Sequence, residues 1–195
     1  MDNPDYMSPW NPQKSLMITP KEYEQQVAEW LTCAGASLTQ FQISHLAQLS
    51  GTGGEYEFDA VSEFSIFEGA QIIVLIECKR YNRPVEREVV LSLHSKLSDV
   101  GAHKAMIFST SGFQRGALEY AVAHGIATII FVDGKSNYHT RSRNTHVSEI
   151  PEWIEFPKYA GWFISYSGNS IRSTIIENKE LQPIEDWVKR DISIA

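Results

Sequence analysis

The chain has 195 residues, of which 43% are hydrophobic and 21% are charged, and its formal net charge is −7. This composition is that of a folded globular protein and excludes a disordered chain. No apolar run approaches the ~20 residues needed to cross a bilayer, and residues 1–18 lack the features of a signal peptide. We therefore expect one soluble, cytoplasmic domain that does not contact a membrane.

Charge is distributed unevenly along the chain. A net negative charge disfavours a protein that coats nucleic acid by bulk electrostatics. The stretch from Lys79 to Arg115, however, contains seven Lys or Arg residues and only three acidic ones. A local basic surface is therefore compatible with the acidic remainder of the chain. The two cysteines, Cys33 and Cys78, have no metal-ligand spacing and are predicted to lie in the core.

The first predicted element is a helix that begins at Thr19. Thr19, Pro20 and Glu22 have the spacing of a capping box with proline in the first turn. The apolar residues that follow share one helical face, and Gly35 ends the pattern; they are Tyr23, Val27, Trp30 and Leu31.

Three strands are predicted next, over residues 38–47, 56–64 and 71–78. The glycine-rich segment 50–54 predicts a turn between the first two. The uninterrupted apolar run 72–76 is typical of a central strand that is covered on both faces.

Strands and helices alternate in the second half of the chain. A helix is predicted over residues 85–97, a strand over 105–108, a helix over 116–124 that begins near Phe113, and a strand over 126–132. This alternation requires crossover connections and indicates an α/β fold.

The C-terminal part of the sequence is less regular. Residues 135–146 are polar and predict a loop, the aromatic-rich segment 153–166 carries enough apolar surface to pack on the core, and a final helix is predicted over about 184–191. We predict an irregular N-terminal arm, a core and a C-terminal elaboration packed on that core: residues 1–18, 19–134 and 135–195.

The residues that point to chemistry are Asp59 on one strand and Glu77-Cys78-Lys79 at the end of the next. Side chains alternate along a strand, so Glu77 and Lys79 project from one face and Cys78 from the other. If the two strands pair as a hairpin, two carboxylates and one ammonium meet at an edge of the sheet.

Such a group has the parts needed for phosphodiester hydrolysis. Carboxylates hold Mg²⁺, which activates water and stabilises negative charge, and a lysine neutralises charge at the phosphate. The alternative is an ordinary solvated strand face with a weak ion pair. The apolar strand that ends directly in Glu77 and Lys79, and the second acid at Asp59, favour the catalytic interpretation.

Several further segments strengthen this interpretation. In chain order they are Tyr23-Glu24, Gly51-Thr52-Gly53-Gly54 before Phe58-Asp59, Ile76 to Tyr81 with Pro84-Val85, Ser109 to Phe113, Gly116-Ala117 and Tyr120-Ala121. Together they resemble the Mrr-type catalytic domain of the PD-(D/E)XK nuclease superfamily, over about residues 19–134. The resemblance implies a restriction-endonuclease-like α/β fold, with a central mixed sheet flanked by helices.

The resemblance also implies Mg²⁺-dependent DNA cleavage, with Mn²⁺ as a substitute. It implies that Asp59 and Glu77 are metal ligands, that Lys79 is catalytic, and that Glu24 completes the metal site. The alternative for Glu24 is a solvated helix residue. Many members carry a glutamine on the helix after the lysine, where this chain has Leu91.

Five further residues are candidates for contacts to DNA. Arg80, Arg83 and Arg87 could hold phosphates beside the cut, and Gln114 and Arg115 stand at a predicted helix N-terminus, which favours anions. Solvated surface residues are the alternative. The histidines show no metal-ligand spacing, and we interpret them as incidental; they are His45, His94, His103, His124, His139 and His146.

The sequence therefore predicts a metal-dependent DNA endonuclease with a restriction or defence role. Alternatives are a DNA-binding module of the same fold that does not cut or cuts only with a partner, a DNA repair nuclease, and a protein-interaction domain that uses residues 153–166. A homodimer would allow double-strand cleavage, and an additional specificity subunit could supply sequence preference.

Overall fold

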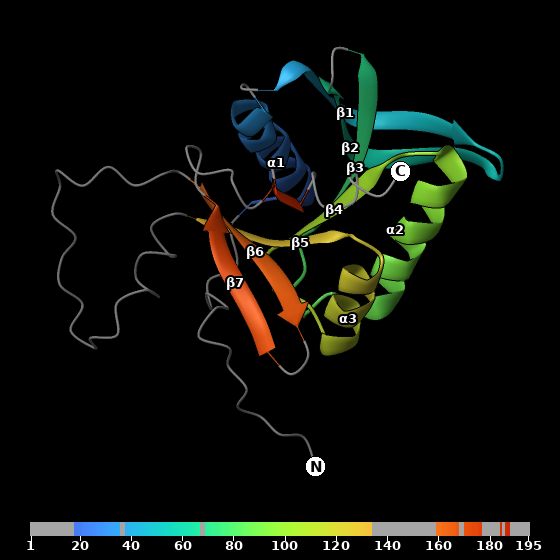
Figure 1. Cartoon of the computed structure of the whole chain (residues 1–195). Helices are drawn as coiled ribbons and strands as arrows, with labels where there is room; N and C mark the ends of the chain where they lie inside the picture. The colour runs from blue at the N-terminus through green and yellow to red at the C-terminus, as the bar shows by residue number, and fades with distance from the viewer. Residues whose placement is uncertain are drawn as a thin grey trace, which may run out of the picture.

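The computed structural model describes residues 18–35, 38–66, 69–133, 159–167, 170–176, 184, 186 and 187, and one mixed sheet forms its centre (Figure 1). The elements in chain order are α1 (Pro20–Ala34), β1 (Thr39–Gly51), β2 (Gly54–Ile66), β3 (Ala70–Lys79), α2 (Arg87–Val100), β4 (Lys104–Ser109), α3 (Arg115–Ala123), β5 (Ala127–Asp133), β6 (Tyr159–Ser167) and β7 (Ser170–Ile176).

The strands stand in the sheet in their chain order, from β1 to β7. Neighbours are antiparallel from β1 to β3, parallel from β3 to β5 and antiparallel from β5 to β7. The predicted α/β class with a central mixed sheet and flanking helices is thus confirmed. None of the described helices is both long and apolar enough to span a membrane.

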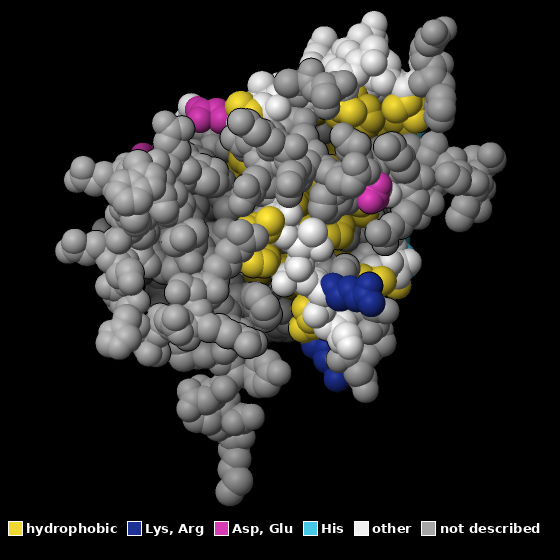
Figure 2. Space-filling model, turned by 60° about the vertical axis from the view of Figure 1, so that its left-hand side comes forward, with side chains coloured by type: hydrophobic (Ala, Val, Ile, Leu, Met, Phe, Trp, Pro, Cys, Tyr) yellow, Lys and Arg dark blue, Asp and Glu magenta, His cyan; other side chains and the backbone are white. Residues whose placement is uncertain are grey.

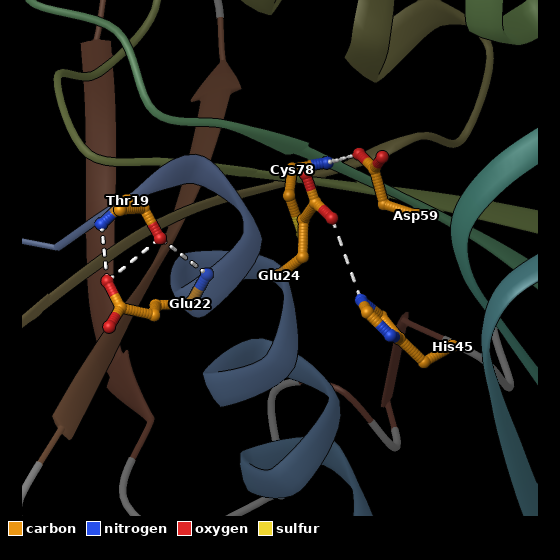
Figure 3. Close-up of polar contacts among 6 residues, drawn as sticks. All are labelled: Thr19, Glu22, Glu24, His45, Asp59 and Cys78. Atoms are coloured by element: carbon orange, nitrogen blue, oxygen red, sulfur yellow. Dashed lines mark hydrogen bonds and ion pairs between the residues drawn. The ribbon is translucent and has the colours of Figure 1, made fainter.

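Helix α1 begins as its sequence predicts. The backbone N–H of Glu22 donates to Thr19 Oγ1 at 3.2 Å, and the Glu22 carboxylate accepts from the backbone N–H of Thr19 at 2.7 Å (Figure 3). This reciprocal pair is a capping box, which satisfies two donors that a helix N-terminus otherwise leaves open. The capped helix turns the buried side chains of Tyr23, Val27 and Trp30 onto the sheet.

Strand β3 is buried on both faces, as its apolar run predicts. Ile72, Val74 and Ile76 pack with α1, whereas Leu75 and the partly buried Ile73 pack on the side of α2 and α3. The sheet is therefore a middle layer between α1 on one face and α2 with α3 on the other, an arrangement visible in Figure 1.

The two helices after the parallel strands begin later than predicted. Val85 and Phe113, which the sequence assigned to these helices, form an isolated parallel bridge. The Val85 N–H donates to the Gly112 carbonyl and the Gln114 N–H donates to the Val85 carbonyl, each at 2.9 Å. Val85 is fully buried, so its apolar character reflects this bridge and not a helical face.

The structure adds two strands that were not predicted. Strands β6 and β7 lie within residues 135–195 and continue the sheet beyond β5. A final helix is supported only at residues 184, 186 and 187, where Trp187 Nε1 donates to the Gly125 carbonyl at 2.9 Å. The predicted arm and the predicted loop over residues 135–146 lie outside the described residues, apart from Ile18, and the division into arm, core and elaboration stays a prediction.

The two cysteines differ in environment. Cys78 is buried, as predicted, and packs on the α1 side of the sheet. The prediction that Cys33 lies in the core is wrong, because Cys33 is exposed near the end of α1. Its position falls outside the stripe of apolar residues that α1 turns toward the sheet.

A carboxylate on α2 holds the glycine-rich turn between β1 and β2. The Asp99 side chain accepts hydrogen bonds from the Thr52 hydroxyl and from the backbone N–H of Gly53, the latter at 2.8 Å. The hydrogen bond from Thr52, followed by those from Gly53 and Tyr56, lowers the pKa of Asp99 below its ordinary value. These hydrogen bonds therefore hold the turn between β1 and β2 to α2.

We expect Asp99→Ala to lower the melting temperature at pH 7. A carboxylate whose folded-state pKa is lowered contributes stability above its unfolded value of ~3.9, and this stability is lost as the pH falls through the folded-state pKa. The difference from wild type should thus shrink below about pH 4. Thermal unfolding from pH 7 to pH 3, with the exposed Glu57→Ala as control, measures it; a difference that is constant with pH would contradict the assignment.

Candidate active site

Asp59 lies where β2 and β3 separate. The ladder between these strands runs from Ile66 and Ala70 to Ala60 and Ile76 and ends there. At the next position, Asp59 Oδ2 accepts a hydrogen bond from the backbone N–H of Cys78 at 2.6 Å (Figure 3). The carboxylate thus takes the place of a main-chain partner and is fixed against the end of β3.

The backbone opposite Asp59 is irregular. The β1–β2 ladder passes from His45 paired with Ala60 to Ala47 paired with Phe58, so Leu46 stands across from Asp59. Leu46 has a φ of 52°, in the left-handed region that non-glycine residues rarely adopt. Backbone strain of this kind often occurs at functional sites.

The hairpin changes faces at this irregular position. The strand residues before Leu46 that face inward, Phe41 and Ile43, pack with α1. Ala47, which should point to the same side by simple alternation, packs instead with the cluster around α2. Asp59 therefore stands at a twist of the sheet and not within an ordinary stretch of strand.

Burial is the main influence on the Asp59 carboxyl group and raises its pKa to about 6. The hydrogen bond from Cys78 opposes the rise, whereas the negative charges of Glu77 and Glu24 add to it. Lys79 acts in the opposite direction. Partial burial and the nearby negative charges of Glu77 and Glu24 thus disfavour the charged form of Asp59.

Glu77 and Lys79 form an ion pair at the end of β3. The Lys79 Nζ donates to Glu77 Oε1, and the side chains are only 19% and 15% exposed, respectively. Cys78 between them points toward α1, as the strand alternation predicts. The structure therefore brings Asp59, Glu77 and Lys79 together at one edge of the sheet.

Lys79 remains protonated in this position. Its burial disfavours the ammonium, but the attraction of Glu77, followed by smaller effects of Tyr81 and Asp59, outweighs burial and raises the pKa of Lys79 above its ordinary value. The site thus combines a carboxyl group whose pKa is raised with a lysine whose pKa is also raised, which favours the protonated form of both.

Glu24 approaches the same region from α1. Its carboxylate lies 3.6 Å from His45 Nε2 of β1, and Figure 3 shows it between Asp59 and His45. The Glu24 side chain is 18% exposed, which disfavours the alternative of a solvated helix residue, and its part in a metal site stays a prediction. Its influence on the pKa of Asp59 places it at the edge of the site.

The five candidates for DNA contacts stand where α2 and α3 begin, beyond the carboxyl ends of β3 and β4. Arg83 is exposed and pairs with Glu86, and Arg115 is exposed and pairs with Glu119 at 2.8 Å. The remaining three also lie on this edge, and they are Arg80 after β3, Arg87 at the first position of α2 and Gln114 at the N-cap of α3.

Comparison with known families assigns the chain. The Mrr catalytic domain family, described as restriction endonuclease, matches residues 15–136, which is more than half of the sequence. The chain belongs to this family. The match spans every element from α1 to β5, and thus all residues of the site described above.

This Mrr-type domain was also compared with curated proteins and with solved structures. No curated protein matches it. A solved structure described as a protein of unknown function, AF1548, is 23% identical to it, with a TM-score of 0.46. The similarity covers 56% of this chain and 57% of that chain.

Among the described residues, no three His, Cys, Asp or Glu side chains form a group that could hold a metal ion. Glu77 pairs with Lys79, Lys79 also acts on the pKa of Asp59, and Glu24 lies beside His45. Leu91, at the position where many family members carry glutamine, is 44% exposed on α2.

Three of the four described histidines interpreted as incidental have specific hydrogen-bond or ion-pair partners. His45 faces Glu24, His94 Nδ1 lies 3.0 Å from the Tyr120 hydroxyl, and His103 Nδ1 accepts from the Ile73 N–H at 3.2 Å. The sequence did hold a signal for His45, because it alternates in phase with Phe41 and Ile43 and therefore points inward. His124 is exposed and stacks on the ring of His94 at 4.2 Å, whereas His139 and His146 lie outside the described residues.

Proposed function

We propose that this member of the Mrr family is a Mg²⁺-dependent DNA endonuclease that hydrolyses phosphodiester bonds with Asp59, Glu77 and Lys79. The observation that carries the proposal is the meeting of a partly buried carboxyl group on β2, that of Asp59, with the Glu77–Lys79 ion pair on β3. Family membership supports DNA as the substrate and restriction or defence as the role.

The chemistry of the acids fits a divalent cation. The raised pKa of Asp59 reflects burial and repulsion from Glu77 and Glu24, and a bound cation relieves both costs by favouring the charged carboxylate. Mg²⁺ prefers one or two carboxylates and keeps several of its waters, so Asp59 and Glu77 suffice as protein ligands. Glu24 is proposed to join them, and Mn²⁺ to substitute for Mg²⁺.

The bound metal would supply activated water and charge stabilisation at the phosphate. The residues of the chain do the remaining work. Asp59 is held by the Cys78 N–H, so its carboxylate is oriented before any ligand arrives. Lys79, cationic and partly shielded from water, is placed to neutralise negative charge that develops on the scissile phosphate.

Phosphates on either side of the cut require further positive charge. Arg87 and Arg115 each occupy the first position of a helix, and the Val85–Phe113 bridge places these helix starts next to one another. Arg80, Arg83 and Gln114 extend this edge. In Figure 2 the Lys and Arg side chains visible among the described residues lie near one another, with an Asp or Glu side chain a short way above them.

These features support a path for the DNA backbone across the starts of α2 and α3. A homodimer is proposed as the way in which both DNA strands are cut, and an additional specificity subunit as the way in which a DNA sequence is selected.

The metal requirement tests the proposal. The purified protein should nick supercoiled plasmid with Mg²⁺ or Mn²⁺, and a chelator should abolish the nicking because the acids alone cannot activate water. Agarose gels of the relaxed product over time measure the rate. Nicking that persists with chelator would contradict the metal site, and metal-independent DNA binding without any nicking would favour the non-cutting module.

A further inference from the structure

Tyr81 is an exposed aromatic residue beside the proposed catalytic lysine. It follows β3 by two residues, and its side chain is among the few large apolar ones that reach solvent in the described part of the chain, with 38% exposed. Lys79 Nζ lies 6.0 Å from the centroid of the Tyr81 ring. The ring therefore stands next to the position where the scissile phosphate would be neutralised.

The backbone that carries this ring is fixed. The Thr110 N–H donates to the Lys79 carbonyl at 3.2 Å, and the Thr110 hydroxyl donates to the Tyr81 carbonyl at 3.0 Å. The segment after β3 is thus held to the segment after β4 at both residues. An exposed aromatic ring on an anchored backbone loses little conformational entropy when it contacts a ligand.

The core does not need this ring. Tyr81 belongs to none of the apolar clusters of the described residues, and the hydrogen bond that Thr110 donates to it reaches its backbone carbonyl and not its side chain. Its ring lies beside the ammonium group of Lys79. The position therefore favours a role toward a ligand over a role in folding.

We propose that the Tyr81 ring stacks on a nucleobase next to the cut, which makes the enzyme selective for DNA with an unpaired or unstacked base there. This inference rests on the proposed nuclease function and deepens it by naming the class of substrate. Stacking of a base on an aromatic side chain is sequence-tolerant, because every base offers a flat face.

The selectivity follows from what a duplex leaves accessible. A base inside a paired duplex is already stacked on both sides, so it can reach the ring only after it is unstacked, which costs a few kcal/mol. A base at a flap, gap or bulge reaches the ring without most of that cost. The acidic chain, with a net charge of −7, also gains less from non-specific phosphate attraction than a basic protein would.

The test compares two DNA substrates of the same sequence, one a continuous duplex and one with a single unpaired nucleotide. Single-turnover cleavage with Mg²⁺ is measured for wild type, Tyr81→Phe and Tyr81→Leu, with the exposed Val122→Ala of α3 as control. Wild type, Tyr81→Phe and the control should cut the unpaired substrate faster, by a factor of at least about five. Tyr81→Leu should lose this preference, since it removes the ring and keeps an apolar side chain.

A binding measurement separates this inference from the nuclease function itself. With chelator present, a 2-aminopurine at the unpaired position should lose fluorescence on binding wild type and Tyr81→Phe but not Tyr81→Leu. If no protein cuts DNA and this fluorescence change still depends on the ring, the nuclease proposal fails and the stacking site stands. Equal preference and equal fluorescence change in Tyr81→Leu and wild type would overturn the stacking site.

Discussion

Asp59→Asn should abolish cleavage and at the same time leave the metal-free protein more stable than wild type at pH 8. Asparagine has nearly the same shape, and its carbonyl oxygen can still accept the hydrogen bond from the Cys78 N–H. It lacks the negative charge that holds a cation, so we expect the rate of nicking to fall at least about 100-fold. Plasmid nicking with saturating Mg²⁺ measures this loss.

The gain in stability follows from the sign of the pKa shift. The folded-state pKa of Asp59 is about 6, above the ordinary value, so its contribution to stability is complete below ~3.9 and is lost as the pH rises through the folded-state value. At pH 8 the buried charge is a cost that asparagine removes. Allowing for the part of the carboxylate that water reaches, the gain is about 1 kcal/mol.

Urea unfolding with chelator at pH 8 and pH 5 measures that gain, which should be smaller at pH 5. Glu57→Gln, an exposed acid on the same strand, is the matched control and should change neither rate nor stability. If Asp59→Asn unfolds more easily than wild type at pH 8, the Asp59 charge stabilises the fold. That result would contradict the predicted cost of burying this charge.

Phe108→Ala should cost about 3–5 kcal/mol of unfolding free energy. Phe108 is fully buried on β4, and its ring contacts Trp30 and Phe131 with centroids 6.0 Å away in both cases. The substitution leaves a cavity between α1 and the sheet, beside the pairing of Phe108 with Cys78. Because folded domains are stable by only about 5–15 kcal/mol, this loss is a large part of the total stability.

Chemical denaturation of wild type, Phe108→Ala and Phe108→Leu measures this effect. The leucine variant should lose less, since it fills most of the cavity. Val122→Ala on the exposed side of α3 should stay within about 0.5 kcal/mol of wild type. A loss below about 1 kcal/mol for Phe108→Ala would mean that the core around α1 is not packed as described.

Local rules were enough to predict the parts of the fold that local chemistry determines. The capping box at Thr19 forms because its donors and acceptors are three residues apart. Strand alternation places Glu77 and Lys79 together, since the distance between them is fixed by the strand itself. Within the site, the sequence therefore predicted the pair on β3 and its approach to Asp59.

Contacts between distant segments were beyond such rules. Strand β6 forms because β5 offers a free edge, and nothing in the aromatic-rich sequence of residues 159–167 specifies that partner. The bridge between Val85 and Phe113 likewise joins two loops. Their apolar residues have the spacing of a helical face, so the sequence assigned them to the helices that follow. Leucine rarely adopts a left-handed backbone, so the sequence does not indicate this conformation at Leu46. The twist of the hairpin beside Asp59 therefore cannot be predicted from it.

The proximity of Glu24 and His45 shows the same limit inside the site. Each residue fits an inward position on its own element, but their separation of 3.6 Å depends on how α1 lies across β1. Glu24 is predicted only through the family resemblance, and the sequence spacing of the histidines gives no sign that His45 lies beside an acid in space.

The nicking rate of Lys79→Met, compared with that of Lys96→Met, tests the central claim most directly. Methionine keeps the length of each side chain and removes the charge, and Lys96 is a matched lysine on α2 whose Nζ lies 5.5 Å from the Phe58 ring. We predict that Lys79→Met loses at least about 100-fold in rate while Lys96→Met stays within about threefold of wild type. Equal rates for the two variants would contradict a catalytic site built on Asp59, Glu77 and Lys79.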